Sequence, residues 1–445
     1  MIIDFSVENF KSIKEEQTFS MAAVNLRNEH PEHVFSYDKN ISLVKTAAIY
    51  GANASGKSNL LEALLALRNF IVDSTDLKLD ARILYYRPYK LDKNYSRRSS
   101  NFEIEFIGND KIRYKYNISF NEKEVEKEKL VFYPRTQEAL LFERKIGENI
   151  TFGSQLKGRK KDIENQLLPN NLFLSKAANS NHEQLGNIYK YFLYNLNFNT
   201  GFILAREPCQ STTMQLARQD NPEFKNKLID FLIACDTGIL SVGIRKNDRD
   251  NEFSYMLNDI IDNISKSEEH TGDDIKSKLW KPFSFKPVTY HTLFEDKKET
   301  GEAEFELYEE SDGTLKMYAL AGKLIPVLEN GLTLIVDELD TSLHPHLSEY
   351  LIELFNSPEK NPNNAQLVFT THDTSLLNSK LFRRDQVWFA KRNSYGATEF
   401  ISLDEFDKDE VRKNVPFEKW YLSGRFGAIP KINKNLFEPV EKCKE

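Results

Sequence analysis

The first residues of the chain alternate between hydrophobic and polar positions, with Ile3, Phe5 and Val7 facing one way and polar side chains between them. This period of two predicts a β-strand with one buried face. A short apolar run over residues 45–50 stops at Gly51, and it predicts a second, buried strand.

After Gly51 the spacing of the hydrophobic residues changes to that of a helix with one apolar stripe. The stripe is formed by Leu60, Leu61, Leu64, Leu65 and Leu67. Strand-like alternation returns between about Phe102 and Phe142, and strands and helices alternate again from Phe305 onward. Between about residues 180 and 284 the chain is polar and mostly helical in pattern.

This order of elements predicts an α/β protein. We expect a mixed sheet around the leucine-rich helix, an added antiparallel sheet and an inserted helical domain. The expected boundaries are residues 1–179 for a first lobe, 180–284 for the helical insertion and 285–445 for a second lobe.

The composition is that of an ordinary globular protein, with 40% hydrophobic and 29% charged residues. Because no run approaches 18 apolar residues and the N-terminus lacks a signal-peptide pattern, we expect a cytoplasmic protein without membrane contact. The net charge of −7 argues weakly against a protein that grips duplex DNA by phosphate neutralisation alone. The 3 cysteines are scattered, which excludes a disulfide framework, a zinc ribbon and a hook-type metal dimerisation motif.

Residues 51–58 read Gly-Ala-Asn-Ala-Ser-Gly-Lys-Ser and match the phosphate-binding pattern G-x-x-x-x-G-K-[ST]. Glycines let backbone N–H groups approach phosphate, Lys57 reaches the β- and γ-phosphates, and the Ser58 hydroxyl coordinates Mg²⁺. The helix that follows directs its positive end at the anion. The motif therefore predicts that ATP and Mg²⁺ bind here. The expected contact residues are Gly51, Asn53, Ser55, Gly56, Lys57, Ser58 and Asn59.

A second apolar strand, residues 332–336, ends in Asp337 and Glu338. Adjacent side chains of a strand diverge, so the two carboxylates can serve different purposes. We expect Asp337 to hold Mg²⁺ through water and Glu338 to polarise the water that attacks the γ-phosphate. Taken alone, such a pair can also be an ordinary solvated strand end.

Two further segments complete the candidate chemistry. Ser311, Gly313 and Thr314 precede a predicted helix and form a second anion-binding helix start, which implies a site completed by another subunit. A third apolar strand ends near His372, and we expect this histidine to contact the γ-phosphate. An ordinary capped helix and a structural histidine are the alternatives.

The order of these motifs resembles the ABC ATPase superfamily, with residues 340–345 similar to its D-loop. Residues 9–13, Asn-Phe-Lys-Ser-Ile, resemble the first strand turn of the Rad50/SMC/OLD branch, which implies that Lys11 and Ser12 lie near the nucleotide. Residues 383–388 and 421–430 resemble the C-terminal pattern of the stand-alone AAA15/AAA21 ATPases of abortive infection and phage defence, a group that includes the PARIS and RloA/AbiL ATPases.

This resemblance implies an ABC-ATPase head that works as a head-to-tail dimer or a higher oligomer. It also implies the role of a sensor or scaffold that controls a separate effector, such as a Toprim-like nuclease. A nucleic acid and a phage protein both stay open as the trigger.

Two features depart from the wider superfamily. The signature reads Ser-Asp-Gly-Thr where transporters have Leu-Ser-Gly-Gly-Gln, and the Q-loop glutamine has only Asn179 as a stand-in. The basic clusters at 157–161 and 391–392 suit either a solvated turn or contact with nucleic acid.

A Rad50- or RecF-like DNA-repair ATPase is the main alternative, since the ATP site alone does not identify the process it drives. A nuclease of the OLD type would need a Toprim domain, for which the segment after His372 is too short. Outside the ATPase motifs the sequence shows no set of carboxylates or histidines arranged for Mg²⁺, so we expect any toxicity to come from the separate effector.

Overall fold

The computed structural model describes residues 1–26, 29–199, 206–218, 221–246, 285–406 and 417–429. The chain divides into two compact units. One consists of Ile2–Leu193 and Phe369–Glu445, here called the P-loop unit. The other consists of Tyr194–Val368 with Met1, here called the α9 unit.

The P-loop unit contains most of the strands. They are β1 (Ile2–Glu8), β2 (Gln17–Ser20), β3 (Val34–Ser36), β4 (Ser42–Val44), β5 (Thr46–Tyr50), β6 (Ser100–Ile107), β7 (Arg113–Phe120), β8 (Val125–Tyr133), β9 (Ala139–Lys145), β10 (Thr151–Phe152), β17 (Val387–Arg392) and β18 (Thr398–Ser402). Its helices are α1 (Lys57–Asp73), α2 (Lys161–Glu164), α3 (Phe173–Asn179), α4 (Glu183–Tyr194), whose last residue belongs to the α9 unit, and α11 (Phe417–Leu422).

The α9 unit is richer in helix. Its elements are β11 (Leu196–Asn199), α5 (Arg206–Leu216), α6 (Pro222–Ala234), β12 (Ser241–Lys246), β13 (Phe285–Glu295), β14 (Lys298–Glu306), α9 (Asp312–Asn330), β15 (Thr333–Val336) and α10 (Pro345–Asn356). Strand β16 (Gln366–Thr370) crosses the boundary between the units.

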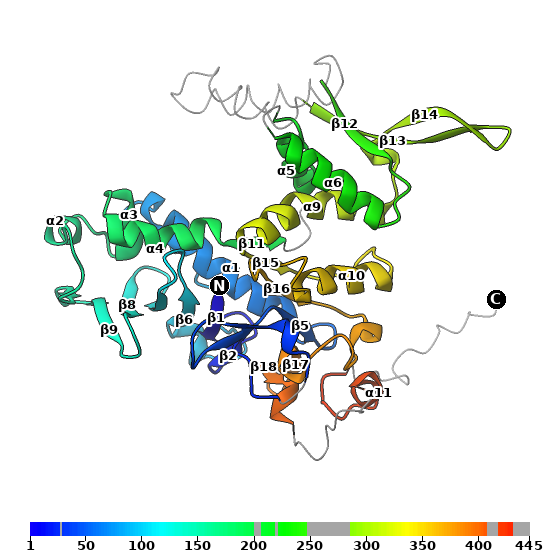
Figure 1. Ribbon diagram of the computed structural model, residues 1–445. Coiled ribbons are helices and arrows are strands. Elements are labelled where there is room, and N and C mark those ends of the chain that lie inside the picture. Colours follow the sequence, from blue (N-terminus) through cyan, green and yellow to red (C-terminus); the bar gives the residue numbers. More distant parts are fainter. Residues whose placement is uncertain (27–28, 200–205, 219–220, 247–284, 407–416, 430–445) are drawn as a thin grey trace, which may run out of the picture. The chain divides into compact units, whose positions relative to one another are not determined.

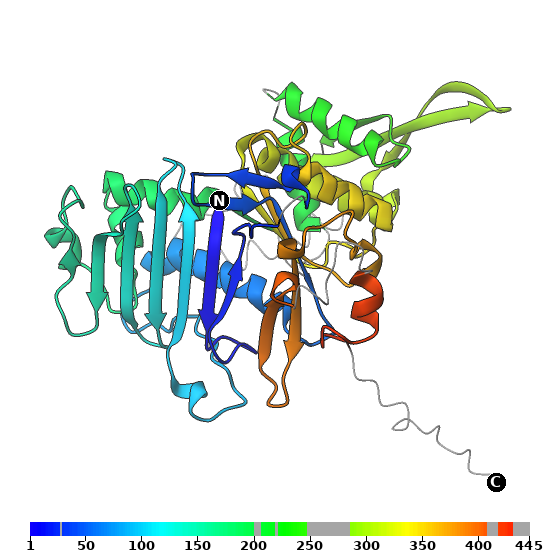
Figure 2. The ribbon, with the colours of Figure 1, turned by 60° about the horizontal axis from the view of Figure 1, so that its bottom comes forward.

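A seven-stranded antiparallel sheet, in the order β10-β9-β8-β7-β6-β1-β2, dominates the P-loop unit (Figure 2). Helix α1 packs on one face through Phe70, whose ring lies 5.0 Å from that of Phe120 on β7. Helix α4 adds Tyr191, stacked 4.2 Å from Phe106 on β6. Polar residues alternate with these aromatic ones, and this sheet is the added antiparallel sheet predicted from the alternation in the sequence.

A second sheet positions the loop of residues 51–58, here called the P-loop. Fully buried β5 pairs in parallel with β17, and β17 pairs antiparallel with β18. The predicted strand that ends at Gly51 and the predicted helix after it are both present, as β5 and α1. The prediction of an α/β fold with a mixed sheet around this helix is therefore confirmed.

The α9 unit is built around its longest helix. Helix α5 packs on α9, where the hydroxyls of Thr213 and Tyr318 lie 3.0 Å apart and Gln215 Nε2 donates to the Gly322 carbonyl oxygen at 2.7 Å. A glycine is needed at position 322, because a side chain there would collide with Thr212 of α5. Strands β12, β13 and β14 form a separate three-stranded antiparallel sheet (Figure 1).

The expected helical insertion, residues 180–284, is described only in part, because residues 247–284 lie outside the described ranges. Helices α4, α5 and α6 do occur in it, and so do two strands that the sequence analysis did not anticipate, β11 and β12. Strand β11 pairs in parallel with β15, with Leu196 opposite Thr333. Four residues of alternation were too short a signal to separate it from the helices. None of the helices in the described part of the chain has the length and apolarity that a membrane span requires.

Candidate functional site

The P-loop connects β5 to α1 and takes a backbone path that few side chains tolerate. Gly56 has φ 98° and Ala54 has φ 62°, both in the left-handed region. A Cβ on Gly56 would collide with the hydroxyls of Ser12 and Thr398. Glycine is therefore required at position 56, both for its backbone angle and for lack of space.

The side chains of the loop suit a phosphate ligand. Lys57 is buried, and its ammonium donates to the carbonyl oxygens of Gly51 at 2.7 Å and Ala52 at 3.2 Å. The hydroxyl of Ser55 is buried and, within the described residues, has no hydrogen-bond partner. A buried unsatisfied hydroxyl is costly unless a ligand completes it. Asn53 is exposed and Ser58 is half-buried at the start of α1.

A chain of hydroxyl and amide groups fixes the loop from behind. Asn59 Nδ2 donates to Ser12 Oγ at 2.6 Å, and Ser12 Oγ lies 2.6 Å from Thr398 Oγ1. Thr398 in turn donates to the carbonyl oxygen of Ser55 at 2.7 Å. Ser12 is thus brought to the P-loop, and Thr398 is a supporting residue that the sequence analysis missed.

Lys11 precedes this network and is held beside α1. It has φ 50°, its backbone N–H donates to the Arg87 carbonyl oxygen at 2.7 Å, and its ammonium pairs with Glu62 of α1. The side chain is therefore directed to the helix that follows the P-loop.

His372 follows β16 in the same unit. The Thr371 N–H donates to the carbonyl oxygen of Ile49 at 3.2 Å, two residues before the P-loop begins. This bond brings the exposed His372 to the end of β5. Asn179, the stand-in for a Q-loop glutamine, donates through Nδ2 to the hydroxyl of Thr75 at 2.6 Å.

The carboxylate pair lies in the α9 unit, directly after the buried strand β15. Glu338 has φ 52°, an uncommon value for a residue with a side chain. The turn is closed by Thr341, whose N–H donates to the Glu338 carbonyl oxygen and whose hydroxyl donates to Glu338 Oε2, both at 3.2 Å. Strained backbone of this kind is typical of functional sites.

Lys316 of α9 holds the same turn and was not singled out in the sequence. Its ammonium donates to the carbonyl oxygens of Glu338 at 3.0 Å, Leu339 at 2.9 Å and Thr341 at 2.6 Å. Burial lowers the pKa of Lys316 to about 8, although the carboxylates of Asp340 and Glu338 act in the opposite direction. Lys316 thus secures, together with Thr341, the turn that carries Glu338.

The signature residues begin the same helix. Ser311 is the N-cap of α9, and its Oγ accepts from the Thr314 N–H at 3.1 Å. A Cβ on Gly313 would come within 3.0 Å of the Ser342 carbonyl oxygen, which leaves little room for a side chain. Ser311 is exposed and Thr314 is buried.

The predicted residues therefore fall into two groups. The P-loop unit brings together Lys11, Ser12, the loop itself and His372, and the α9 unit brings together Asp337, Glu338 and the signature. The hydroxyl of Ser58 and the carboxylate of Asp337 are oxygen donors of the kind that Mg²⁺ prefers, so the donor chemistry fits that ion.

The basic clusters are engaged locally. Lys161 pairs with Glu164 at 2.8 Å, and Lys391 pairs with Glu399 at 3.1 Å.

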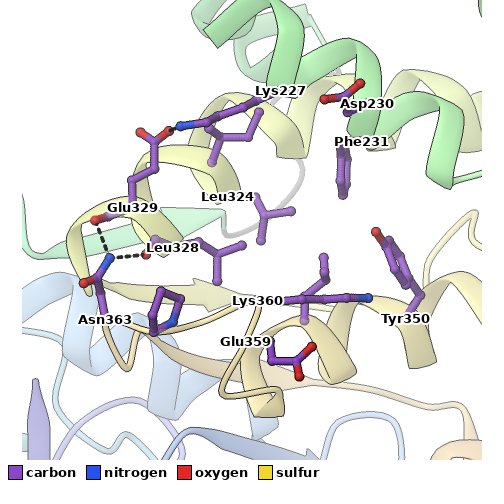
Figure 3. A pocket seen from close by; sticks show the side chains of 13 residues that line it. Lys227, Asp230, Phe231, Leu324, Leu328, Glu329, Tyr350, Glu359, Lys360 and Asn363 are labelled. Atoms are coloured by element: carbon purple, nitrogen blue, oxygen red, sulfur yellow. Dashed lines mark hydrogen bonds and ion pairs between the residues drawn. The ribbon is translucent and has the colours of Figure 1, made fainter. Parts of the chain in front are cut away.

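A separate groove of about 520 Å³ lies between α6, α9 and α10 (Figure 3). Its floor is apolar, with Phe231, Leu324 and Leu328 among the lining residues, and charged side chains such as Lys227 and Glu329 stand at its rim. None of the predicted site residues line it, so it is distinct from the P-loop and from the Glu338 turn.

A family model described as "AAA domain, putative AbiEii toxin, Type IV TA system" matches residues 47–378, more than half of the chain. The matched segment begins in β5 and ends just after His372, so it includes every predicted site residue except Lys11 and Ser12. No curated protein matches the sequence.

Solved structures with a similar arrangement include an SMC head bound to the C-winged helix domain of ScpA, at 12% identity and TM-score 0.43, covering 92% of this chain and 99% of that one. Another is the recombination mediator RecF with ATP, at 14% identity and TM-score 0.34, covering 90% of this chain and 97% of that one. At these identities and scores the likeness carries no information about function.

Proposed function

Because the chain belongs to the family described as "AAA domain, putative AbiEii toxin, Type IV TA system", we propose that it binds ATP with Mg²⁺ at the P-loop and hydrolyses it. The observation that supports this most is the local chemistry of the loop. The Lys57 ammonium donates to a carbonyl oxygen of the loop itself, and the Ser55 hydroxyl is buried without a partner in the described structure. The residues around Gly56 leave no room for a side chain at that position.

The residues divide the chemistry between binding and hydrolysis. Lys57 and the N-terminus of α1 neutralise phosphate charge. Ser58 and Asp337 would each offer an oxygen ligand to Mg²⁺, and that ion would screen the charge of the phosphate oxygens. Glu338 orients the attacking water, and His372 contacts the γ-phosphate.

We further propose that the working form is a head-to-tail dimer. In it, Ser311, Gly313 and Thr314 face the nucleotide held by the partner's P-loop. The exposed start of α9, with Ser311 as its cap, supports this arrangement. For each chain of this dimer we propose two ATPase lobes, residues 1–179 and 285–445, with residues 180–284 as an insertion between them in the sequence.

The cellular role that fits best is a cytoplasmic sensor or scaffold in phage defence, which controls a separate effector such as a Toprim-like nuclease. It rests on the abortive-infection resemblance, and the family description also names a toxin system. That description supports a second candidate, in which this chain is itself the toxic component. A DNA-repair ATPase is the remaining alternative.

The ATPase proposal is tested by nucleotide binding and phosphate release. Lys57→Ala should lower ATP affinity by at least about 100-fold, a loss on the order of 3 kcal/mol for a charge-assisted contact. Glu338→Gln should keep ATP affinity and lose hydrolysis. Lys225→Met, at an exposed position on α6, is the matched control and should behave as the parent. Hydrolysis by Glu338→Gln at the parent rate would remove Glu338 from its assigned role.

The cellular role is tested by expressing the chain with and without its candidate effector. The sensor model predicts no toxicity from this chain alone and toxicity only with effector and trigger. Toxicity of the chain alone that Lys57→Ala abolishes would favour the toxin candidate. Hydrolysis that rises strongly with added DNA would favour the repair ATPase.

A further inference from the structure

Two histidines and a glutamate meet at a short turn of the P-loop unit that takes no part in the proposed ATP site. The turn is a 3₁₀ helix, η1 (Pro31–His33), preceded by His30. His30 Nδ1 lies 3.0 Å and His33 Nε2 3.5 Å from the same oxygen, Glu32 Oε1. The imidazole rings of His30 and His33 are stacked, with centroids 4.5 Å apart and planes 10° apart.

The hydrogen bonds of the outer ring nitrogens determine which tautomer each histidine adopts. His30 Nε2 lies 2.9 Å from the Ser379 carbonyl oxygen, which can only accept, so this nitrogen carries a hydrogen. In the neutral ring, His30 Nδ1 then presents a lone pair to Glu32.

The same argument holds for His33, because the orientation of Gln386 is fixed. The Arg383 N–H donates to Gln386 Oε1 at 2.9 Å, and Gln386 Nε2 donates to Thr46 Oγ1 at 2.6 Å. Gln386 Oε1 is therefore an acceptor, and His33 Nδ1, 3.0 Å away, must donate to it. His33 Nε2 then also presents a lone pair to Glu32.

In their neutral forms, His30 and His33 therefore each direct a lone-pair nitrogen at the same carboxylate oxygen of Glu32. Ligands of a tetrahedral Zn²⁺ at its usual bond lengths stand about 3.3 Å apart, which is close to the two distances measured to Glu32. The guanidinium of Arg383 is paired with Asp385 at 2.7 Å.

We propose that His30, Glu32 and His33 form a binding site for a borderline divalent transition metal, with Zn²⁺ as the representative ion. The set of two imidazoles and one carboxylate suits such ions and not Mg²⁺ or Ca²⁺. Outer-nitrogen hydrogen bonds to a carbonyl and an amide are the usual way in which ligating histidines are oriented. Solvent supplies the remaining position, since Glu32 is half exposed.

Backbone conformation supports the assignment. His30 has φ 40° and ψ 66°, and it precedes Pro31, a combination that costs conformational energy. Through Ser379 and Gln386 the site joins the start of the chain to the segment that follows β16. Metal binding should therefore stabilise this junction within the P-loop unit.

The test uses the untagged full-length chain, stripped with chelator and titrated with Zn²⁺ in buffer that contains millimolar Mg²⁺. We expect one Zn²⁺ per chain at this site, a rise in Tm on binding, and a visible absorption spectrum of tetrahedral Co²⁺ when Co²⁺ replaces it. His30→Ala and Glu32→Gln should each lower Zn²⁺ affinity at least about 10-fold and remove the Co²⁺ spectrum.

The exposed His346 lies 3.5 Å from Glu349 in the α9 unit, which makes His346→Ala the control for surface imidazole binding. This variant should keep the parent Zn²⁺ affinity. The proposal would be overturned if the parent, His30→Ala and Glu32→Gln bound Zn²⁺ with equal affinity while circular dichroism showed all three to be folded. The contacts of Glu32 with the two histidines would then be ordinary ion pairs. ATP binding by these variants is a separate readout, so the metal site and the ATPase proposal fail independently.

Discussion

The P-loop and the turn that carries Glu338 are held in place in different ways. The P-loop is secured by side chains from three separate parts of the sequence, Ser12, Asn59 and Thr398. The Glu338 turn is secured by its neighbour Thr341 and by one ammonium group, that of Lys316. The first arrangement suits a rigid binding loop, and the second suits a catalytic turn that one helix can adjust.

The helix that supplies Lys316 also begins with the signature. Ser311 caps α9, and Lys316 lies in the next turn of the same helix. In the proposed dimer, contact of Ser311 and Gly313 with the partner's nucleotide is therefore linked through one rigid helix to the Glu338 turn of the same chain. Within the proposed function, this difference predicts that the ATP-binding loop is held rigid and that the rate of hydrolysis responds to contact with the partner chain.

The largest effect is expected on ATP affinity when the rigid P-loop is disrupted. Gly56→Ala places a methyl group against the Ser12 and Thr398 hydroxyls at a backbone angle of φ 98°. We expect ATP affinity to fall by at least about 100-fold, because strain and collision together cost several kcal/mol. Titration with a fluorescent ATP analogue measures the loss.

Gly186→Ala on α4 is the matched control, since nothing lies within 4 Å of a Cβ there. It should keep the parent affinity and raise stability by up to about 1 kcal/mol. Parent-like ATP affinity in Gly56→Ala would show that the loop is not constrained as described.

A smaller effect is expected on the hydrolysis rate when the Glu338 turn loses the support of Lys316. Lys316→Met should leave ATP affinity unchanged and lower the hydrolysis rate by about 10-fold, because removing three charge-assisted bonds frees the Glu338 turn. Lys225→Met is again the control. Loss of ATP affinity in step with rate would mean that Lys316 supports the fold and not the turn.

Titration of Lys316 should also make the stability of the chain depend on pH. Its pKa is lowered by burial from 10.5 to about 8, so the folded chain releases this proton near pH 8 and the unfolded chain retains it until about pH 10.5. Between these values the unfolded state binds more protons, and the residue's contribution to the free energy of unfolding rises with pH.

The same deprotonation removes the ammonium from the Glu338 turn, so the parent hydrolysis rate should fall as pH rises through about 8. Lys316→Met should lack both the steeper rise in stability and the fall in rate. Chemical denaturation and phosphate release, each measured from pH 7 to about 10, check the two effects. Identical pH profiles for the parent and Lys316→Met would contradict the assignment.

The smallest effect concerns the start of α9. Ser311→Ala removes the N-cap and should cost about 1 kcal/mol of stability in thermal unfolding. Ser154→Ala, at an exposed turn position, is the control. In the proposed dimer Ser311 also contacts the partner's nucleotide. At a protein concentration that favours the dimer, Ser311→Ala should therefore lower the hydrolysis rate by more than the loss of folded protein accounts for.

The elements set by local pattern could be predicted from the sequence. Strand β5, helix α1 and the strand before Asp337 follow from residues within a few positions of one another. Strand β11 could not be predicted, because four residues among helical segments carry too weak a signal and its partner β15 lies more than 130 residues away.

The supporting contacts of the candidate site were missed for two physical reasons. Ser12 and Thr398 are 386 residues apart, so only the fold brings them together. A lysine at position 316 of an amphipathic helix is expected to be solvated, and nothing in its neighbours signals the carbonyl oxygens that it meets. The His30–His33 spacing was visible in the sequence, but the tautomers that make it a metal site depend on Ser379 and Gln386.

The central claim is that bound ATP joins two chains through Ser311, Gly313 and Thr314, and the most direct test is the mass of Glu338→Gln in solution. Light scattering at micromolar protein should give 51.7 kDa without nucleotide and about twice that mass with ATP and Mg²⁺. Adding Lys57→Ala to the same chain should restore the monomer. A Glu338→Gln chain that binds ATP, leaves it uncleaved and stays monomeric would contradict the account.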